Sequence, residues 1–383
     1  MIPYGRQSIS EADIQAVVDV LRSDFITQGP MIERFETIVA EYCGVAHAIA
    51  VSNGTAALHL AVMGLGLGES GLLWTSPITF AASANCARYC GAGVDFVDID
   101  PFTYNMSADA LSVKLESAEK IGELPDVVVP VHFAGASCDM MRIRSLADRY
   151  GFRVLEDAAH AIGGSYLDGH VGSCAYSDAT TFSFHPVKII TTGEGGMVLT
   201  NDDAVARRVR LLRTHGITRD EALMHGAPDG PWYYQQLELG YNFRMTDIQA
   251  ALGASQMNRI DEFVARRNEI AERYTAAFAS LPVRCQVVSP DVRSAYHLFV
   301  IELERHDRAA IFSVLKESGL GVNVHYIPVH LHPYYRDLGF APGDFPHAER
   351  YYANVITLPM FPSMSDADVD AVIAALAAAT GEG

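Results

Sequence analysis

Positive charge is scarce in this sequence. The 383 residues include 28 Lys and Arg against 46 Asp and Glu, which gives a formal net charge of −18. Proteins that bind nucleic acid neutralise its phosphates with clustered Lys and Arg, so this balance argues against a nucleic-acid partner. An anionic ligand would instead be held by helix N-termini, a few arginines and uncharged donors.

Cysteine and long apolar segments are scarce as well. The six cysteines are scattered and form no C-x2-C pair, which excludes a disulfide framework and a zinc ribbon. Residues 42–68 carry no formal charge, but His47, His59 and the glycines of 64–68 interrupt them, so we expect no membrane span. The opening MIPYGRQSIS lacks the basic and apolar regions of a secretory signal. We therefore expect a soluble, cytoplasmic protein.

The order of apolar runs predicts the fold. Short, continuously apolar runs alternate with helical patterns, which is typical of strands buried on both faces of a sheet. We predict an α/β fold with a largely parallel sheet, whose strands include 47–52, 94–99, 126–133, 152–157 and 195–200. A helix is expected at 138–151, which ends in glycine, and Ser10 with Asp13 resembles a capping box before another helix.

The length of the chain favours two domains. A long helical pattern runs from about 245 to about 278. A smaller mixed segment follows it, with a strand at 295–303, a helix at 307–318 and a final helix after Ser365. We predict a large domain over 1–253 and a smaller α/β domain over 254–383.

One lysine stands in an unusual place. The stretch SFHPVKIITTGEGG (183–196) has only two formal charges, Lys188 and Glu194, and connects a strand-like run to a glycine-rich turn. Lysine is rarely buried unless it is paired or used. A surface loop is the ordinary interpretation of such a residue. In a partly desolvated pocket, however, an amine loses proton affinity and becomes a nucleophile that forms Schiff bases.

Two further motifs lie where predicted strands end. Asp157, in EDAAHA, closes an apolar strand, and ligands of open α/β sheets bind at such carboxyl ends. Ser52–Ala56 follows another strand and opens a helix, whose N-terminal N–H groups bind phosphate well. Each motif taken alone has a structural alternative, a turn for Asp157 and simple helix capping for Ser52–Ala56.

Taken together, these motifs fit pyridoxal phosphate. That cofactor needs a lysine to hold it, an acid to keep its pyridine nitrogen protonated and a cradle for its phosphate. The sequence offers Lys188, Asp157 and a cradle of Gly54-Thr55-Ala56 with Ser183. Phe80 is a candidate for the stacking face of the flat ring.

Other polar residues carry weaker signals. Asn242 and Arg244 stand just before the long helix, and Arg244 could simply pair with nearby acids. His325, His330 and His332 match no common metal spacing, and Pro and Tyr separate them, so we expect ligand binding or packing and no metal site.

The motifs occur in the order found in a known family. They are ITQGP, NGTAAL, EDAAHA, SFHPVK, TTGEGG, RTHGI, YNFRMTDIQAAL and VHYIPVHLHPYY. With them, nearly the whole chain resembles the DegT-type sugar aminotransferases, which are pyridoxal-phosphate enzymes of fold type I, the aspartate-aminotransferase fold. Within this family the chain is most similar to the UDP-4-keto-sugar transaminases of the pseudaminic acid pathway.

The resemblance implies an activity and partners. It implies a homodimer with shared active sites, L-glutamate as amino donor and a UDP-linked 4-keto-6-deoxy-N-acetylamino sugar as acceptor. The product would be UDP-4-amino-4,6-dideoxy-N-acetyl-β-L-altrosamine.

The resemblance also implies roles for single residues. Lys188 would be the Schiff-base lysine and Asp157 the partner of the pyridine nitrogen. The other cofactor contacts would be Gly54, Thr55, Ala56, Phe80, His160, Ser183 and, from the neighbouring subunit, Asn242. Substrate contacts would be Tyr4, Asp24, Phe25, Ile26, Thr27, Arg244, His325, Tyr326, Ile327 and Pro328.

Other functions stay open at this point. A sister aminotransferase could act on another UDP- or dTDP-linked keto sugar. Dehydratases of the same fold lack the Schiff-base lysine, so the presence of Lys188 speaks against them. A non-catalytic, cofactor-binding regulator is the alternative from another class, and the pairing of Lys188 with Asp157 favours catalysis over it.

Overall fold

A sheet of seven strands forms the centre of the protein, whose computed structural model describes residues 1–381. The strands are β1 (His47–Val51), β2 (Leu72–Thr75), β3 (Gly93–Phe96), β4 (Val127–Val129), β5 (Arg153–Asp157), β8 (Ala179–Ser183) and β9 (Gly196–Thr200). They lie in the order β1-β9-β8-β5-β4-β2-β3. Only β9 runs antiparallel to its neighbours in this sheet, which confirms the predicted largely parallel arrangement.

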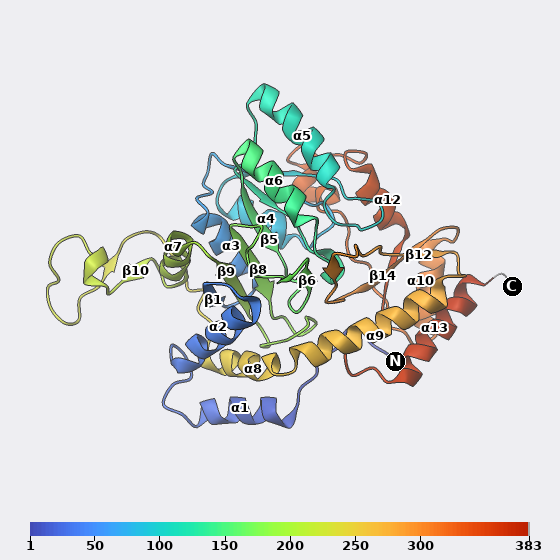
Figure 1. The fold of residues 1–383 in the computed structure, drawn as a ribbon, viewed down its shortest axis with the longest axis horizontal. Coiled ribbons are helices and arrows are strands. Elements are labelled where there is room, and N and C mark those ends of the chain that lie inside the picture. Colours follow the sequence, from blue (N-terminus) through green and yellow to red (C-terminus); the bar gives the residue numbers. More distant parts are fainter. Residues whose placement is uncertain (382–383) are drawn as a thin grey trace.

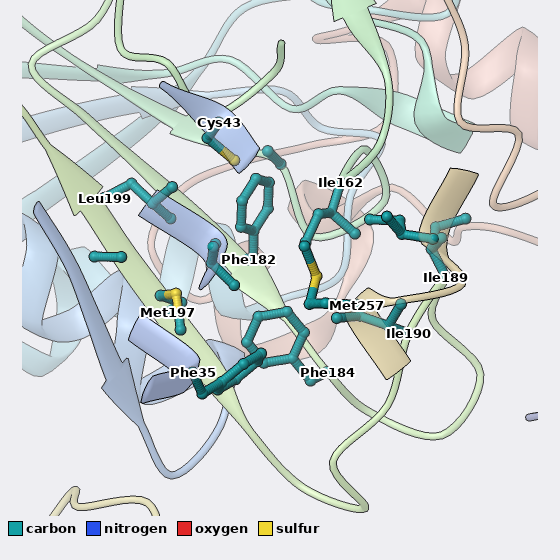
Figure 2. Packing of buried hydrophobic residues seen from close by; sticks show 14 of the residues in the cluster. Phe35, Cys43, Ile162, Phe182, Phe184, Ile189, Ile190, Met197, Leu199 and Met257 are labelled. Atoms are coloured by element: carbon teal, nitrogen blue, oxygen red, sulfur yellow. The ribbon is translucent and has the colours of Figure 1, made fainter. Parts of the chain in front are cut away.

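Helices cover both faces of the sheet (Figure 1). One layer consists of α3 (Gly54–Gly64), α4 (Ala82–Tyr89) and α7 (Asp203–Arg213), and the other of α2 (Pro30–Cys43), α5 (Ala108–Ile121), α6 (Met140–Tyr150) and α8 (Asp247–Met257). Successive residues of β1 point to opposite faces of the sheet: Ile49 packs with α3 and α7, and Ala50 packs with α2 and α8. Figure 2 shows the hydrophobic core between the sheet and helices α2 and α8, where the rings of Phe35 and Phe184 lie 5.2 Å apart. Burial on both faces explains why the strands read as continuous apolar runs.

The predicted element positions are largely confirmed. The strands expected at 47–52, 152–157 and 195–200 match within one residue, and those expected at 94–99 and 126–133 are shorter. The helix expected at 138–151 spans Met140–Tyr150. At the start of α1 (Glu11–Leu21), Ser10 Oγ accepts from Asp13 N and Asp13 Oδ2 accepts from Ser10 N, so the capping box is confirmed.

The single helix expected from about 245 to 278 is wrong. Two helices, α8 and α9 (Ile260–Phe278), meet at Asn258 and Arg259, and Arg259 has non-helical dihedrals (φ −119°, ψ 8°). A contact with the first helix lies at this break. The guanidinium of Arg259 donates to Asp13 Oδ2 at 2.5 Å and to the carbonyl of Ser8 at 3.1 Å, which ties α1 to the junction.

The C-terminal part has its own sheet, β12 (Val283–Cys285), β14 (Phe299–Leu303) and β15 (Val355–Leu358). Helices α10 (Arg308–Glu317), α11 (Pro333–Arg336), α12 (Pro346–Asn354) and α13 (Asp366–Thr380) accompany it. The helices expected at 307–318 and after Ser365 are thus confirmed. The strand expected at 295–303 begins only at Phe299, because the N–H groups of Ala295 and Leu298 bond to the carbonyls of Gly135 and Ala134 instead.

The first residues of the chain join this C-terminal part. Ile2 forms a bridge with Leu320, and the carbonyl of Tyr4 accepts from Met360 N at 3.0 Å. Short strands complete the fold: β6 (Ser165–Tyr166), β7 (Gly169–His170), β13 (Val292–Arg293) and the pair β10 (Ile217–Thr218) and β11 (Gln235–Gln236). The segment around β10 projects from the body (Figure 1). Within residues 1–381, none of the helices has the length and apolar character needed to cross a membrane.

Candidate active site

A large cavity, the main cavity, lies at the carboxyl ends of the parallel strands. It has a volume of about 960 Å³. Its walls include the last residues of β5 and β8 and segments that follow β1, β2 and β4. This edge is where open α/β sheets bind ligands. Of the residues named from the sequence, it brings together Tyr4, Gly54, Thr55, Ala56, Phe80, Asp157, His160, Ser183, Lys188, His325 and Tyr326.

Lys188 reaches the cavity from the loop between β8 and β9. Its N–H donates to the His185 carbonyl at 2.8 Å, and Phe184 anchors both ends of the loop through bonds with Thr192 and Gly195. The half-buried ammonium group loses hydration, which lowers the pKa of Lys188 from 10.5 to about 8, although the negative charge of Asp157 acts in the opposite direction. Part of the Lys188 population therefore carries a neutral amine near physiological pH.

Asp157 is held as a fixed acceptor at the end of β5. It is buried, and its Oδ2 accepts from Ser83 Oγ at 2.6 Å while its Oδ1 accepts from Ala159 N at 3.1 Å. Its backbone is fixed too, since Asp157 N donates to the Pro130 carbonyl and its own carbonyl accepts from His132 N. A carboxylate has about four lone-pair sites, so part of its accepting capacity remains for a ligand.

A cup that could receive an anion lies at the N-terminus of α3. The side chain of Asn53 caps the N–H of Ala56 at 2.8 Å, and the first-turn N–H groups of Gly54 and Thr55 remain for an anion. Ser183 stands against this turn, because a Cβ added at Gly54 would lie 2.9 Å from Ser183 Cβ and 3.1 Å from its Oγ. Glycine at position 54 therefore lets the hydroxyl of β8 approach the helix end.

Another part of the wall of the main cavity consists of aromatic rings and uncharged imidazoles. The ring of His160 bonds to the Tyr326 hydroxyl at 3.1 Å and lies 4.4 Å from the ring of His297. Burial, followed by the charge of Lys188, lowers the pKa of His160 and of His297 well below the ordinary value and that of His325 to about 4. These rings are neutral at physiological pH, so they add donors and acceptors without adding charge.

The residues present fit pyridoxal phosphate. Lys188, whose pKa is lowered, and the buried carboxylate of Asp157 line the same cavity. The anion cup opens into this cavity too, and glycine at position 54 leaves room for it. Phe80 also lines this cavity, with its side chain 64% exposed and its ring 6.5 Å from that of Tyr326. It is thus available as a stacking face.

Several residues named from the sequence lie elsewhere in the single chain. Asp24, Phe25, Ile26 and Thr27 form an exposed segment after α1. Asn242 is exposed and pairs with Thr214, and Arg244 lines a second cavity of about 530 Å³ beside α2 and α7. Ile327 and Pro328 follow Tyr326 but do not line the main cavity.

The three histidines near residue 330 have separate surroundings. His325 lines the main cavity and bonds to Thr357, while His330 is buried and bonds to Glu349 at 3.0 Å. In the part of the chain that the structure describes, no three His, Cys, Asp or Glu residues are grouped in a way that could hold a metal ion.

Some site residues were missed by sequence reasoning. Ser83 donates to Asp157, and its signal was weak because a serine in TFAASAN reads as a helix start. His297 packs on His160 within the cavity, but nothing in the strand-like AYHLFVIEL distinguishes it. His59 lines the cavity beside the ring of Tyr241, at 4.8 Å, and reads as a core residue of an apolar helix.

Comparisons with known proteins agree with this geometry. The model of the DegT/DnrJ/EryC1/StrS aminotransferase family matches residues 7–377. The spore coat polysaccharide biosynthesis protein SpsC of Bacillus subtilis is 42% identical over 382 residues, covering 98% of this chain and 96% of SpsC. An uncharacterized protein of Methanocaldococcus jannaschii, MJ1066, is 40% identical over 381 residues, with 98% and 96% covered.

Solved structures are similar over the same length. The putative sugar aminotransferase Spr1654 of Streptococcus pneumoniae, in its PLP form, has a TM-score of 0.88 and 30% identity, covering 99% of this chain and 98% of that one. Helicobacter pylori PseC, an aminotransferase involved in the biosynthesis of pseudoaminic acid, has a TM-score of 0.89 and 28% identity, with 99% of both chains covered. The chain therefore belongs to the DegT/DnrJ/EryC1/StrS aminotransferase family, and it is an enzyme that depends on pyridoxal phosphate.

Proposed function

We propose that this enzyme moves the amino group of L-glutamate to C4 of a UDP-linked 4-keto-6-deoxy-N-acetylamino sugar. The product is UDP-4-amino-4,6-dideoxy-N-acetyl-β-L-altrosamine, a precursor of pseudaminic acid. The observation that carries the proposal is the shared cavity of Lys188 and Asp157, with the anion cup beside them. The fold similarity to PseC supports the choice of sugar.

The residues of the chain divide the chemistry among them. When bound, pyridoxal phosphate supplies an electron sink for the carbon that loses or gains nitrogen. Lys188, neutral in part because its pKa is lowered to about 8, would take the proton from the carbon that loses nitrogen and, in the second half of the reaction, give a proton to the carbon that gains it. Asp157 would keep a proton on the ring nitrogen, and Gly54, Thr55 and Ser183 would hold the phosphate.

The walls around Lys188 suit a sugar. Tyr4, His325 and Tyr326 offer neutral hydrogen-bonding groups on aromatic bodies, which match hydroxyl groups and the apolar faces of a pyranose. We assign contacts with the remainder of the nucleotide sugar to the segments 24–27 and 327–328 and to Arg244, whose charge suits the diphosphate.

A second substrate has support of its own. Identity to SpsC, named for spore coat polysaccharide biosynthesis, is 42%, against 28% to PseC. A different nucleotide-linked keto sugar, UDP- or dTDP-linked and destined for a polysaccharide, is therefore the alternative acceptor. The reaction at Lys188 would be the same.

We further propose a homodimer with shared active sites. Asn242 and the segment 24–27 are exposed and lie outside the cavity of their own chain, as expected if they serve the cavity of a second copy. Mixing Lys188→Ala chains with Asn242→Ala chains tests this arrangement. In a shared-site dimer, one site of each hybrid regains both residues, so activity appears on mixing; if each site is self-contained, mixing restores nothing.

Absorption spectroscopy tests the reaction. L-glutamate should bleach the visible band of the bound cofactor, and a 4-keto UDP-sugar should then restore it. A band restored only by another keto sugar would favour the alternative acceptor. A band that glutamate leaves unchanged would contradict the proposed donor.

A further inference from the structure

A chain of hydroxyl groups ends on Asp157. Thr79 Oγ1 lies 2.6 Å from Ser83 Oγ, and Ser83 Oγ lies 2.6 Å from Asp157 Oδ2. All three side chains are buried, with at most 5% of their surface exposed. Thr79 and Asp157 line the main cavity, and Ser83 stands behind them as the second residue of α4.

The direction of the hydrogen bonds follows from the chemistry. An ionised carboxylate only accepts, so Ser83 gives its single proton to Asp157. The Ser83 oxygen is then free to accept, and Thr79 donates to it. Each oxygen of Asp157 thus receives one donor, Ser83 on Oδ2 and Ala159 N on Oδ1, and the plane of the carboxylate is fixed.

Helix capping does not account for Ser83. The N-cap of α4 is Ala81, which makes no side-chain cap bond, and the contact of Ser83 Oγ with the Phe80 carbonyl is long, at 3.3 Å. The short bond of this hydroxyl goes to Asp157. Its role is therefore tied to the carboxylate and not to the start of the helix.

We propose that Ser83, supported by Thr79, is a positioning residue that sets the orientation of Asp157 for the ring nitrogen of the cofactor. The inference rests on the proposed role of Asp157. Ser83 and the Ala159 N–H each hold one oxygen of the carboxylate, so Asp157 can face the ring nitrogen in only one orientation. Hydrogen bonds to charged groups are the strong ones, so the loss of this one should be measurable.

The test compares two ligands in Ser83→Ala. One is pyridoxal phosphate and the other is its 1-deaza analogue, in which carbon replaces the ring nitrogen. The wild-type protein should bind pyridoxal phosphate more tightly than the analogue. In Ser83→Ala this preference should fall on the order of tenfold, because only the natural ring touches Asp157.

Two further variants separate positioning from packing. Thr79→Val should reduce the preference in the same direction by a smaller factor, since it removes only the support of Ser83. Ser137→Ala is the matched control, because it removes a buried hydroxyl that bonds to the Cys138 carbonyl at 3.0 Å, and it should leave the preference unchanged.

The outcomes distinguish the two levels of the proposal. If Ser83→Ala weakens the binding of both ligands equally, or of neither ligand, the positioning role of Ser83 is wrong. The proposed role of Asp157 is not affected by that result. If the wild-type protein itself shows no preference for the natural ring, the assignment of Asp157 is wrong, and the role of Ser83 falls with it.

Discussion

Replacing Lys188 should make the cofactor-free protein more stable. Lys188 is held in a half-buried position where the loss of hydration outweighs the attraction of Asp157, and its pKa falls from 10.5 to about 8. Folding at neutral pH therefore brings a positive charge into a place that disfavours it. Lys188→Met keeps the apolar stem and removes the charge.

The magnitude and the pH range follow from linkage. About 1.4 kcal/mol accompanies each unit between the two pKa values, so the protonated lysine costs the folded apoprotein about 3 kcal/mol. Below pH 8 both the folded and the unfolded chain bind the proton, and the full cost is present. Between pH 8 and 10.5 the unfolded chain binds more protons, so stability rises with pH, and above 10.5 the cost has disappeared.

Urea unfolding of the apoprotein between pH 7 and 10 measures this effect. Lys188→Met should have a higher midpoint than the wild type at pH 7, and the difference should shrink as pH rises. Lys120→Met, which removes an exposed lysine, is the control and should follow the wild type at every pH. A Lys188→Met protein that is less stable at pH 7, or a gap independent of pH, would refute the reasoning.

Two other substitutions test the anion cup and the buried pair of Glu156 and His132. Gly54→Ala should weaken cofactor binding on the order of tenfold in an equilibrium titration, because the added Cβ would push Ser183 from the cup. Overpacking of this kind costs about 1–3 kcal/mol. Gly68→Ala is the control and should have no effect, since a Cβ added at Gly68 meets open space. Glu156→Leu should lower the free energy of unfolding in urea by about 3–5 kcal/mol, because Glu156 is buried and bonds to His132 at 2.6 Å, and its polar partners would be left unpaired. An unchanged midpoint in Glu156→Leu would contradict the stabilising role of the pair. Unchanged cofactor affinity in Gly54→Ala would contradict the role of the cup.

The sequence predicts the common position of the candidate residues where they follow strand ends. Asp157 and Ser183 close apolar strands, and Gly54 opens a helix, so their positions along the chain imply one edge of the sheet. Local pattern and tertiary position agree there because carboxyl ends of parallel strands meet at the same edge.

The rest depends on contacts that a local pattern does not contain. The helix expected over 245–278 breaks at Arg259, whose guanidinium bonds to Asp13, 246 residues earlier in the chain. Ser83 reads as an ordinary helix residue until the fold brings it to Asp157, 74 positions away. Sequence periodicity gives no information on either pairing.

Nitrogen transfer is the most direct test of the proposed function. The holoenzyme, supplied with ¹⁵N-labelled L-glutamate and a UDP-linked 4-keto-6-deoxy-N-acetylamino sugar, should produce an amino sugar whose new nitrogen carries the label, and Lys188→Ala should produce none. Label absent from the sugar in the wild-type reaction, or equal transfer by Lys188→Ala, would contradict the account.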